Sequence, residues 1–236
     1  MGSMMALRAH ARGGPEQLVY ERAPAPSAGP GEALIAVHAA AITFAELTWD
    51  LEWTTRDGKN RTPVIPSHET SGIVAGLGVG VAGLAVFAVQ LAAILGGHVT
   101  ATGRSADADF VRDLGADRFI SAEAGGPSQA AGGFDVVIDT VGGTVLDSSY
   151  GLLREGGRLV ALGAPPNQVL ADRRRVRAMF FVVRPDANEL ARLAQMADAG
   201  RLRAVISQTF PLAEGRKAFE SGGEARRPGK TVLVVR

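Results

Sequence analysis

The sequence predicts an α/β fold in which a doubly wound parallel sheet follows a partial, β-rich domain. Residues 4–40 alternate short β-prone runs with Gly- and Pro-rich turns, which is typical of an all-β beginning. From residue 72 onward, apolar runs of strand length alternate with helical segments, and this alternation indicates parallel pairing. The 236 residues, 46% of them hydrophobic, are enough for one large domain or two small ones.

The composition excludes several classes of function. A net charge of +1 gives no basic surface for nucleic acid, and the one dense basic run, at residues 173–177, lacks interleaved aromatic residues and is expected to be a solvated face. Cysteine is absent, which excludes disulfides and thiolate metal sites. The opening Met-Gly-Ser is typical of an expression remnant rather than a signal peptide, so we expect a cytoplasmic enzyme.

The N-terminal part is predicted to be a small β domain. Strands are expected near residues 5–10, 18–21 and 32–39, followed by a short helix within residues 42–50 and a polar loop over residues 52–66. We assign residues 1–71 to this domain, joined by residues 205–236, and residues 72–204 to the parallel α/β domain.

The stretch from residue 71 to 105 organises the rest of the chain. A β-prone run at residues 73–77 leads into Gly78, Gly80 and Gly83, which have the spacing G-x-G-x-x-G, and then into an apolar helix over residues 84–95 and a strand over 98–102. Glycines let backbone N–H groups approach a pyrophosphate, and the start of the helix favours its negative charge. This order predicts a Rossmann-like dinucleotide site, with the helix buried on most sides.

The same stretch has a second interpretation as a membrane span. It carries no charged residue between Glu69 and Arg104, and a hydropathy window of roughly 19 residues would select it. Its many glycines and the lack of a flanking basic cluster oppose a membrane helix, and buried parallel strands are themselves continuous apolar runs. We therefore expect no membrane association.

The residues after the second strand bear on the choice of cofactor. Gly103, Arg104 and Ser105 stand where an NAD site carries an acidic residue for the ribose hydroxyls. A guanidinium and a hydroxyl suit a 2′-phosphate, which favours NADP(H). The alternative is that Arg104 is a solvated surface arginine.

The remaining segments continue the alternation. The sequence predicts helices over residues 106–114, 145–153 and 188–199, and strands over 118–121, 134–139, 158–162, 179–183 and 231–235, of which 134–139 is expected to be buried. Ligands bind at the carboxyl ends of such strands. The loops at residues 78–83, 103–105, 140–143 and 163–166 are therefore expected to converge on one edge of the sheet.

These landmarks resemble the medium-chain dehydrogenase/reductase superfamily, and in particular its zinc-independent quinone and enoyl reductase branch. The segments that carry the resemblance cover nearly the whole chain in family order, among them TPVIPSHETSGIVAGLG, FAVQLAAILGGHVTATGRS, FDVVIDTVGG and GKTVLVV. The resemblance implies a GroES-like first domain and hydride transfer from NADPH to a quinone or an α,β-unsaturated carbonyl compound. It also implies a small-molecule substrate and a homodimer.

The resemblance extends the set of candidate residues. Thr43 falls where related reductases place an Asn beside the nicotinamide, so its hydroxyl could bind a substrate carbonyl or, alternatively, cap a helix. His68 and Glu69 match a family element that helps to bind zinc in alcohol dehydrogenases, but without thiolates a structural pair is expected and no metal site. Tyr150 is a conceivable general acid, although its place in a predicted helix favours packing. The expected catalytic residues are Thr43 and Tyr150, and the expected cofactor-binding residues are Gly78, Gly80, Gly83, Gly103, Arg104, Ser105, Val141, Gly142, Gly163, Ala164, Phe181, Val182 and Lys230.

The chain departs from the family by a missing block, which we place between Val86 and Phe87. The block would contain the first Rossmann strand of the family, so the strand ahead of Gly78 must either be recruited into the parallel sheet or stay in the β domain. Recruitment, or a strand donated by a partner copy, is favoured because a strand must cover the apolar helix. If neither occurs, the alternative function is a non-redox relative that catalyses a cyclisation or isomerisation, or that only binds a partner.

Overall fold

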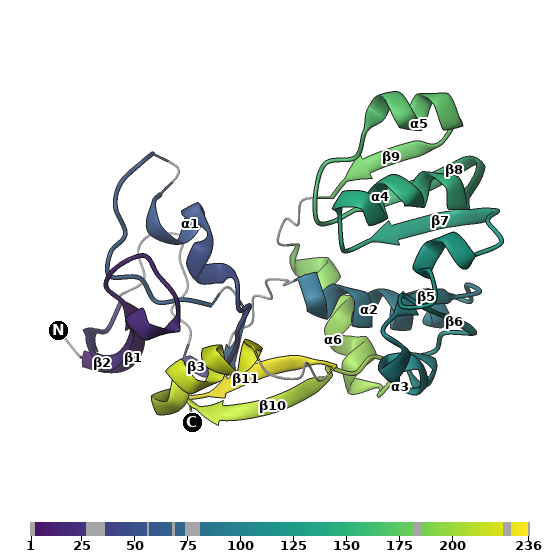
Figure 1. The fold of residues 1–236 in the computed structure, drawn as a ribbon. Helices are drawn as coiled ribbons and strands as arrows, with labels where there is room; N and C mark the ends of the chain where they lie inside the picture. The colour runs from purple at the N-terminus through teal and green to yellow at the C-terminus, as the bar shows by residue number, and fades with distance from the viewer. Residues whose placement is uncertain are drawn as a thin grey trace. The chain divides into compact units, whose positions relative to one another are not determined.

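The computed structural model describes residues 3–26, 36–55, 57–67, 69–73, 81–181, 186–223 and 228–235 (Figure 1). The chain divides into two compact units: unit 1, with residues 1–80, 185–190 and 205–236, and unit 2, with residues 81–184 and 191–204. The boundary expected between residues 71 and 72 falls inside strand β4, Glu69–Ile73.

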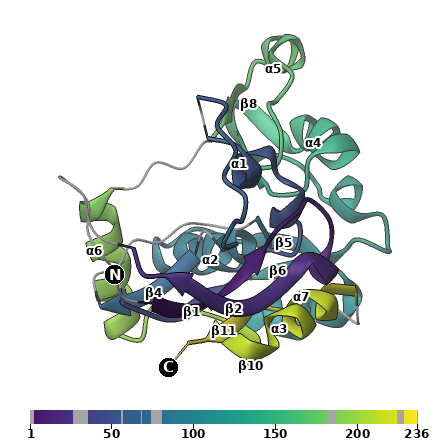
Figure 2. The same ribbon diagram turned by 90° about the vertical axis from the view of Figure 1, so that its left-hand side faces the viewer.

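Unit 1 is built from two small sheets. Strands β1 (Ser3–Ala9) and β2 (Leu18–Pro24) form an antiparallel pair, and a second sheet has the order β10-β11-β3-β4. Its strands are β3 (Ala36–Ala41), β4, β10 (Ile206–Pro211) and β11 (Lys230–Val234). The C-terminal strands thus complete the N-terminal sheet, and Figure 2 shows helix α7, Gly215–Glu220, beside β10 and β11.

The core of unit 1 gathers apolar residues from both ends of the chain. The short helical segments are η1 (Pro15–Gln17), η2 (Glu46–Thr48), α1 (Asp50–Trp53), η6 (Leu212–Glu214) and η7 (Ser221–Gly223). Buried members of the core are Leu7, Ala9, Leu18, Ile42, Leu47, Trp53, Val64, Ala218, Phe219 and Leu233. The helix expected within residues 42–50 is replaced by a turn, η2 and then α1, so the backbone after β3 is less regular than predicted.

Strand β4 corrects the expectation of recruitment. Residues Glu69–Ile73 pair antiparallel with β3 in the sheet of unit 1, with Thr70 opposite Ala40. The recruited strand was expected to begin at Gly72, and Gly72 is instead opposite Val37. Pairing with β3 satisfies the backbone hydrogen bonds of this segment locally, so recruitment of Gly72 and Ile73 was wrong. Residues 74–80, with Gly78 and Gly80, lie outside the described residues.

Unit 2 confirms the predicted α/β class with parallel pairing. Strands β5 (Thr100–Gly103) and β6 (Arg118–Ser121) form one parallel pair, and β7 (Phe134–Asp139), β8 (Leu153–Ala161) and β9 (Arg177–Phe180) form a second parallel sheet. Between them come η3 (Ser105–Asp107), α3 (Ala108–Asp113), η4 (Gly126–Gln129), α4 (Gly143–Ser149), η5 (Tyr150–Leu152) and α5 (Gln168–Arg174). The described strands of the expected single sheet are therefore divided into two groups.

Helix α2, Val81–Ile94, runs without interruption through the junction between Val86 and Phe87. Gln90 is the one polar residue of the predicted helical segment, and it is buried. Its side chain joins α2 to the segment that follows helix α6, Ala187–Asp198. Nε2 of Gln90 donates to the carbonyl of Arg203 over 3.1 Å, and Oε1 accepts from the N–H of Arg203 over 2.9 Å. The helix is not buried on most sides, because the described side chains other than Gln90 are half-buried or exposed. Leu95, just after its end, is 80% exposed.

Among the described residues, the side chains that cover strand β7 lie on one of its faces. Val137 packs against a core formed by Leu146, Tyr150, Leu159, Ala161, Ala171 and Val176. Val136 and Ile138 point to the other face, where they are 41% and 44% exposed. The expectation of a buried strand was therefore wrong, because α4 and α5 contribute their side chains to a single face.

Helix α5 places Arg173 and Arg174 on an exposed surface, in a segment where the sequence predicted a solvated basic run but no helix. Among the described residues, no helix combines the length and the apolar character that crossing a membrane would need.

Candidate functional site

A polar cluster lies at the carboxyl ends of β5 and β6 in unit 2. Glu123 stands at its centre: its Oε2 accepts hydrogen bonds from the Ser105 N–H at 2.9 Å, from Ser105 Oγ at 3.1 Å and from Ser121 Oγ at 2.7 Å. The two serine hydroxyls are 2.6 Å apart. The parallel pairing of β5 with β6, which aligns Gly103 with Ser121, brings these groups together. The cluster is a ready set of donors for one anionic group.

Arg104 lies beside this cluster and is held by a neighbouring carboxylate. Its Nε donates to Asp107 Oδ2 over 2.8 Å and its Nη2 to Asp107 Oδ1 over 3.0 Å, while the side chain remains 46% exposed. The hydrogen bonds that Arg104 donates to Asp107, and then the charge of that carboxylate, raise the pKa of Arg104. The predicted phosphate-binding arginine is thus oriented by an ion pair within its own turn.

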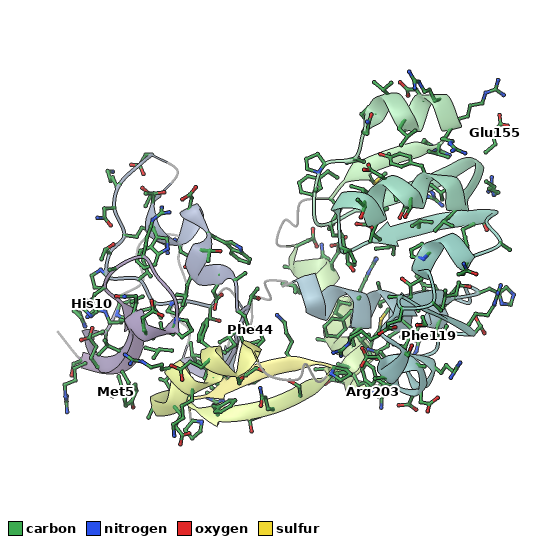
Figure 3. All side chains as sticks on the ribbon, in the orientation of Figure 1. Met5, His10, Phe44, Phe119, Glu155 and Arg203 are labelled. Atoms are coloured by element: carbon green, nitrogen blue, oxygen red, sulfur yellow. The ribbon has the colours of Figure 1, made fainter. Side chains whose placement is uncertain are left out.

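Hydrogen bonds also determine the protonation of Glu123. The Ser121 hydroxyl, followed by backbone N–H groups that include that of Ser105, lowers the pKa of Glu123 to about 2. Glu123 is therefore ionised at every physiological pH. Gly103 allows this cluster to be compact, because a Cβ there would lie 3.3 Å from the ring of Phe119, which Figure 3 labels on β6.

A second cluster forms where β7 and β8 end. The buried carboxylate of Asp139 accepts hydrogen bonds from the N–H groups of Val141 at 3.2 Å and of Gly142 at 2.7 Å. Gly142 has φ +82°, which favours glycine, and its Cα faces Gly163 and Ala164 in the neighbouring loop. The loops at residues 140–143 and 163–166 are therefore neighbours, as the strand order predicts.

The remaining predicted residues of unit 2 have different surroundings. Phe181 is exposed and its N–H donates to the carbonyl of Ala161 over 3.0 Å, while Val182 lies outside the described residues. Gly83 lies in the first turn of α2. Tyr150 is 2% exposed, and its hydroxyl donates to the carbonyl of Asn167 over 3.0 Å, which agrees with a packing role rather than with acid catalysis.

Unit 1 holds a third cluster, around Thr43. Lys230 Nζ donates to Thr43 Oγ1 over 3.3 Å, so the first residue of β11 reaches the segment that follows β3. Glu46, three residues after Thr43, and Glu52 are each 1% exposed. Burial, followed by the nearby Glu52 carboxyl, raises the pKa of Glu46 to about 8, although Lys230 and backbone hydrogen bonds act in the opposite direction.

The neutral form of Glu46 explains how one of its carboxyl oxygens can be buried without a hydrogen bond. Among the residues that the structure describes, the buried Oε1 of Glu46 has no hydrogen-bond partner. An ionised carboxylate with an unpaired buried oxygen is far more costly than a neutral acid. Glu46 thus adds little negative charge near Lys230 at neutral pH. His68, which was expected to form a structural pair with Glu69, is outside the described residues.

Comparison with known proteins identifies the family. The model described as "Zinc-binding dehydrogenase" matches residues 108–233, and the model described as "Alcohol dehydrogenase GroES-like domain" matches residues 29–116. The chain belongs to the zinc-binding dehydrogenase family. The predicted membership of the medium-chain dehydrogenase/reductase superfamily is confirmed.

Relatives of this dehydrogenase-family chain include two curated proteins. The spectinabilin polyketide synthase system protein NorB of Streptomyces orinoci is 34% identical over 167 residues, which cover 65% of this chain and 8% of NorB. The NAD(P)H oxidoreductase RTN4IP1 of Danio rerio is 28% identical over 183 residues, which cover 66% of this chain and 47% of RTN4IP1. The chain thus spans about half the length of RTN4IP1 and a small part of NorB.

A solved structure supports the fold. The quinone oxidoreductase from Coxiella burnetii superposes with a TM-score of 0.81 and 21% sequence identity, covering 100% of each chain. At this identity the likeness establishes the fold alone.

The family name implies a zinc ion, and the resemblance implies a nicotinamide dinucleotide. The residues of this chain do not fit zinc, because the sequence has no cysteine and the described residues contain no cluster of three or more His, Asp or Glu side chains able to hold a metal. For a nicotinamide dinucleotide, the serine hydroxyls, the Ser105 N–H and the guanidinium of Arg104 are a donor set that fits a phosphate at the adenosine end.

Acidic residues in these clusters, among them Asp139, Glu123 and Glu46, were not among the site residues expected from the sequence. Asp139 and Glu123 each stand within two residues of the carboxyl end of a predicted strand, a position that could have marked them as loop-fixing or anion-mimicking groups. Glu46 stands among the apolar residues Phe44, Ala45 and Leu47, and a carboxyl in such a setting is a signal of burial with a shifted pKa.

Proposed function

We propose that this protein is an NADP(H)-dependent oxidoreductase that transfers hydride to a quinone or to an α,β-unsaturated carbonyl compound. The observation that carries the proposal is the donor set of Arg104, Ser105 and Ser121 at the carboxyl ends of β5 and β6, in a chain of the zinc-binding dehydrogenase family. The resemblance to the quinone and enoyl reductase branch supports the substrate class.

Distinct parts of the chain would hold the cofactor. Ser105 and Ser121 would donate to the adenosine 2′-phosphate, and Arg104 would contribute charge. The loops that contain Gly142 and Gly163 would lie against the nicotinamide end, with Val141, Ala164, Phe181 and Val182. Bound NADPH supplies the hydride. These assignments rest on the strand-end positions of the residues and on the family resemblance.

The Thr43–Lys230 pair would orient the substrate. A threonine hydroxyl has one hydrogen and two lone pairs. Because Lys230 donates to Thr43 Oγ1, one lone pair is occupied and the hydroxyl hydrogen can be directed to a substrate carbonyl oxygen. The neutral state of Glu46 adds no opposing charge to this pair, whose ammonium group would stabilise negative charge developing on that oxygen.

Titration with the cofactor tests the proposal. Purified protein is titrated with NADPH and with NADH while cofactor fluorescence is followed, and turnover is then measured with a quinone and with an enone. We expect saturable NADPH binding, with Arg104→Glu weakening NADPH but not NADH. The absence of a saturable signal at millimolar NADPH would remove the reductase assignment.

A second candidate is a non-redox relative that catalyses a cyclisation or isomerisation, or that binds a partner. It is favoured by one observation: β4 pairs with β3 in unit 1, so residues 69–73 add no strand to the parallel sheets of unit 2. This candidate predicts no hydride transfer to either class of acceptor, even at saturating NADPH.

We also propose a homodimer in which a second copy contributes a strand to unit 2. Among the described strands, β5 pairs with β6 alone and β7 pairs with β8 alone. Strands β5 and β7 therefore each have one edge at which no described strand is paired. The exposed Val136 and Ile138 lie on one of these strands. Light scattering after size-exclusion chromatography should give twice the monomer mass, and a monomer at micromolar concentration would contradict the proposal.

A further inference from the structure

The carboxylate of Glu123 occupies a position that is built for an anion. One of its oxygens, Oε2, receives a backbone N–H and two hydroxyl donors at 2.7–3.1 Å. Three donors that converge on one oxygen make the arrangement that a terminal phosphate oxygen prefers. Two donors come from Ser105, just after β5, and one comes from Ser121 at the end of β6; the pairing of β5 with β6 brings them together.

The local charge opposes a second anion. Arg104 is engaged by both carboxylate oxygens of Asp107, and Glu123 adds another negative charge to the same cluster. Arg104, Asp107 and Glu123 together carry a net charge of −1 when all are ionised. A phosphate dianion could not share the donors with Glu123 without strong repulsion.

Glu123 is free to leave this position. Its side chain is exposed and stands in the turn that follows β6, so rotating it into water requires no burial of charge. The hydrogen bonds it gives up would be remade to the incoming phosphate. The competition is therefore between two anions for one donor set.

We propose that Glu123 is a displaceable internal anion in the adenosine 2′-phosphate site, and that it sets the preference between NADPH and NADH. The inference rests on the proposed function. NADPH binds when Glu123 swings out. NADH, which has only a 2′-hydroxyl, binds with Glu123 in place and can donate to the carboxylate.

The test uses the full chain and adenosine fragments, so that binding is measured without turnover. Wild type, Glu123→Gln and a charge-matched control, Glu155→Gln, are titrated calorimetrically with adenosine 2′,5′-bisphosphate, adenosine 5′-monophosphate and inorganic phosphate. Glu155 is exposed on β8 and lies far from Phe119 of the cluster in Figure 3. The Gln substitution keeps the shape of the side chain and removes its charge.

We expect Glu123→Gln to bind the bisphosphate about tenfold more tightly than wild type. Binding of the monophosphate should change little, and Glu155→Gln should resemble wild type. The gain should shrink at high salt, because the cluster is exposed and its charges are screened. Ser121→Ala in the Glu123→Gln background should reverse the gain.

Several results would overturn the inference. Unchanged or weaker bisphosphate binding by Glu123→Gln would show that Glu123 does not compete, while saturable NADPH binding by the same protein would leave the oxidoreductase proposal standing. Equal binding of inorganic phosphate and the bisphosphate would make this a free-phosphate site. A bisphosphate that binds none of the proteins would remove the 2′-phosphate site itself. Conversely, the expected fragment binding without hydride transfer would refute only the oxidoreductase proposal.

Discussion

The Oδ1 of Asp139 accepts a hydrogen bond of 2.7 Å from the N–H of Gly142, and this bond fixes the loop that follows β7. Asp139 is buried, and it also accepts from the N–H of Val141. The loop faces Gly163, so its position determines the surface that we assign to the nicotinamide. Asp139 is a positioning residue for that surface.

Asp139→Ala should therefore destabilise unit 2. The substitution leaves two backbone N–H groups without their acceptor, at a cost of about 1–3 kcal/mol in the free energy of unfolding. Urea denaturation followed by circular dichroism measures this. Asp135→Ala, which removes an exposed carboxylate from the same strand, should cost less than about 1 kcal/mol, and equal effects of the two variants would contradict the assigned role.

Gly142→Ala tests the backbone conformation of the same loop. With φ at +82°, an alanine is strained even though its Cβ would find its nearest neighbour 3.8 Å away, so strain rather than collision sets the cost. We expect a loss of about 1–3 kcal/mol. Gly151→Ala is the control, because a Cβ there meets nothing within 4 Å and the residue has no positive φ. A Gly142→Ala protein as stable as wild type would exclude the strained conformation.

Glu46 should make the stability of the protein depend on pH. Its pKa rises from 4.5 to about 8 in the folded protein because it is buried near Glu52. Between these two pKa values the folded state binds a proton at Glu46 that the unfolded state has released. The stability that this proton contributes is complete below the unfolded-state pKa, and it is lost as the pH rises through the folded-state pKa.

Glu46→Gln should remove that dependence. Relative to wild type, the variant should gain on the order of a few kcal/mol in unfolding free energy between about pH 5 and about pH 8. Urea denaturation across this range measures the gain. Glu220→Gln, which removes an exposed acid of the same unit, is the matched control. Parallel wild-type and Glu46→Gln profiles would show that Glu46 titrates normally.

The sequence predicts local elements better than their partners. The bounds of β6 and β7 match those predicted, because strand length and flanking turns are encoded within a few residues. The pairing of β4 with β3 could not be predicted in this way. The β-prone run expected at residues 73–77 suits either sheet, and the choice for β4 depends on a strand more than 25 residues earlier.

The candidate sites show the same limit. Arg104 and Ser105 are recognised from their position after a strand, but Glu123 is not, because its contacts depend on the parallel register that aligns Gly103 with Ser121. Lys230 and Thr43 are separated by 187 residues, and only the folding of β11 onto β3 brings them together. The residue types at a site are local information, whereas their partners are a property of the sheet.

Thr43 is expected to matter for the reaction rather than for the fold. Thr43→Val removes the hydroxyl but keeps the shape, so turnover of an enone should fall on the order of a hundredfold in kcat/KM, because a donor to the developing oxyanion is lost. Thr43→Ser keeps the hydroxyl and should retain most of the activity. Urea denaturation should show that both variants unfold within about 1 kcal/mol of wild type, because the bond from Lys230 is long and only half-buried. If Thr43→Val and Thr43→Ser have equal kcat/KM, the hydroxyl does not contact the substrate, and the Thr43–Lys230 pair serves only to join β11 to the segment after β3.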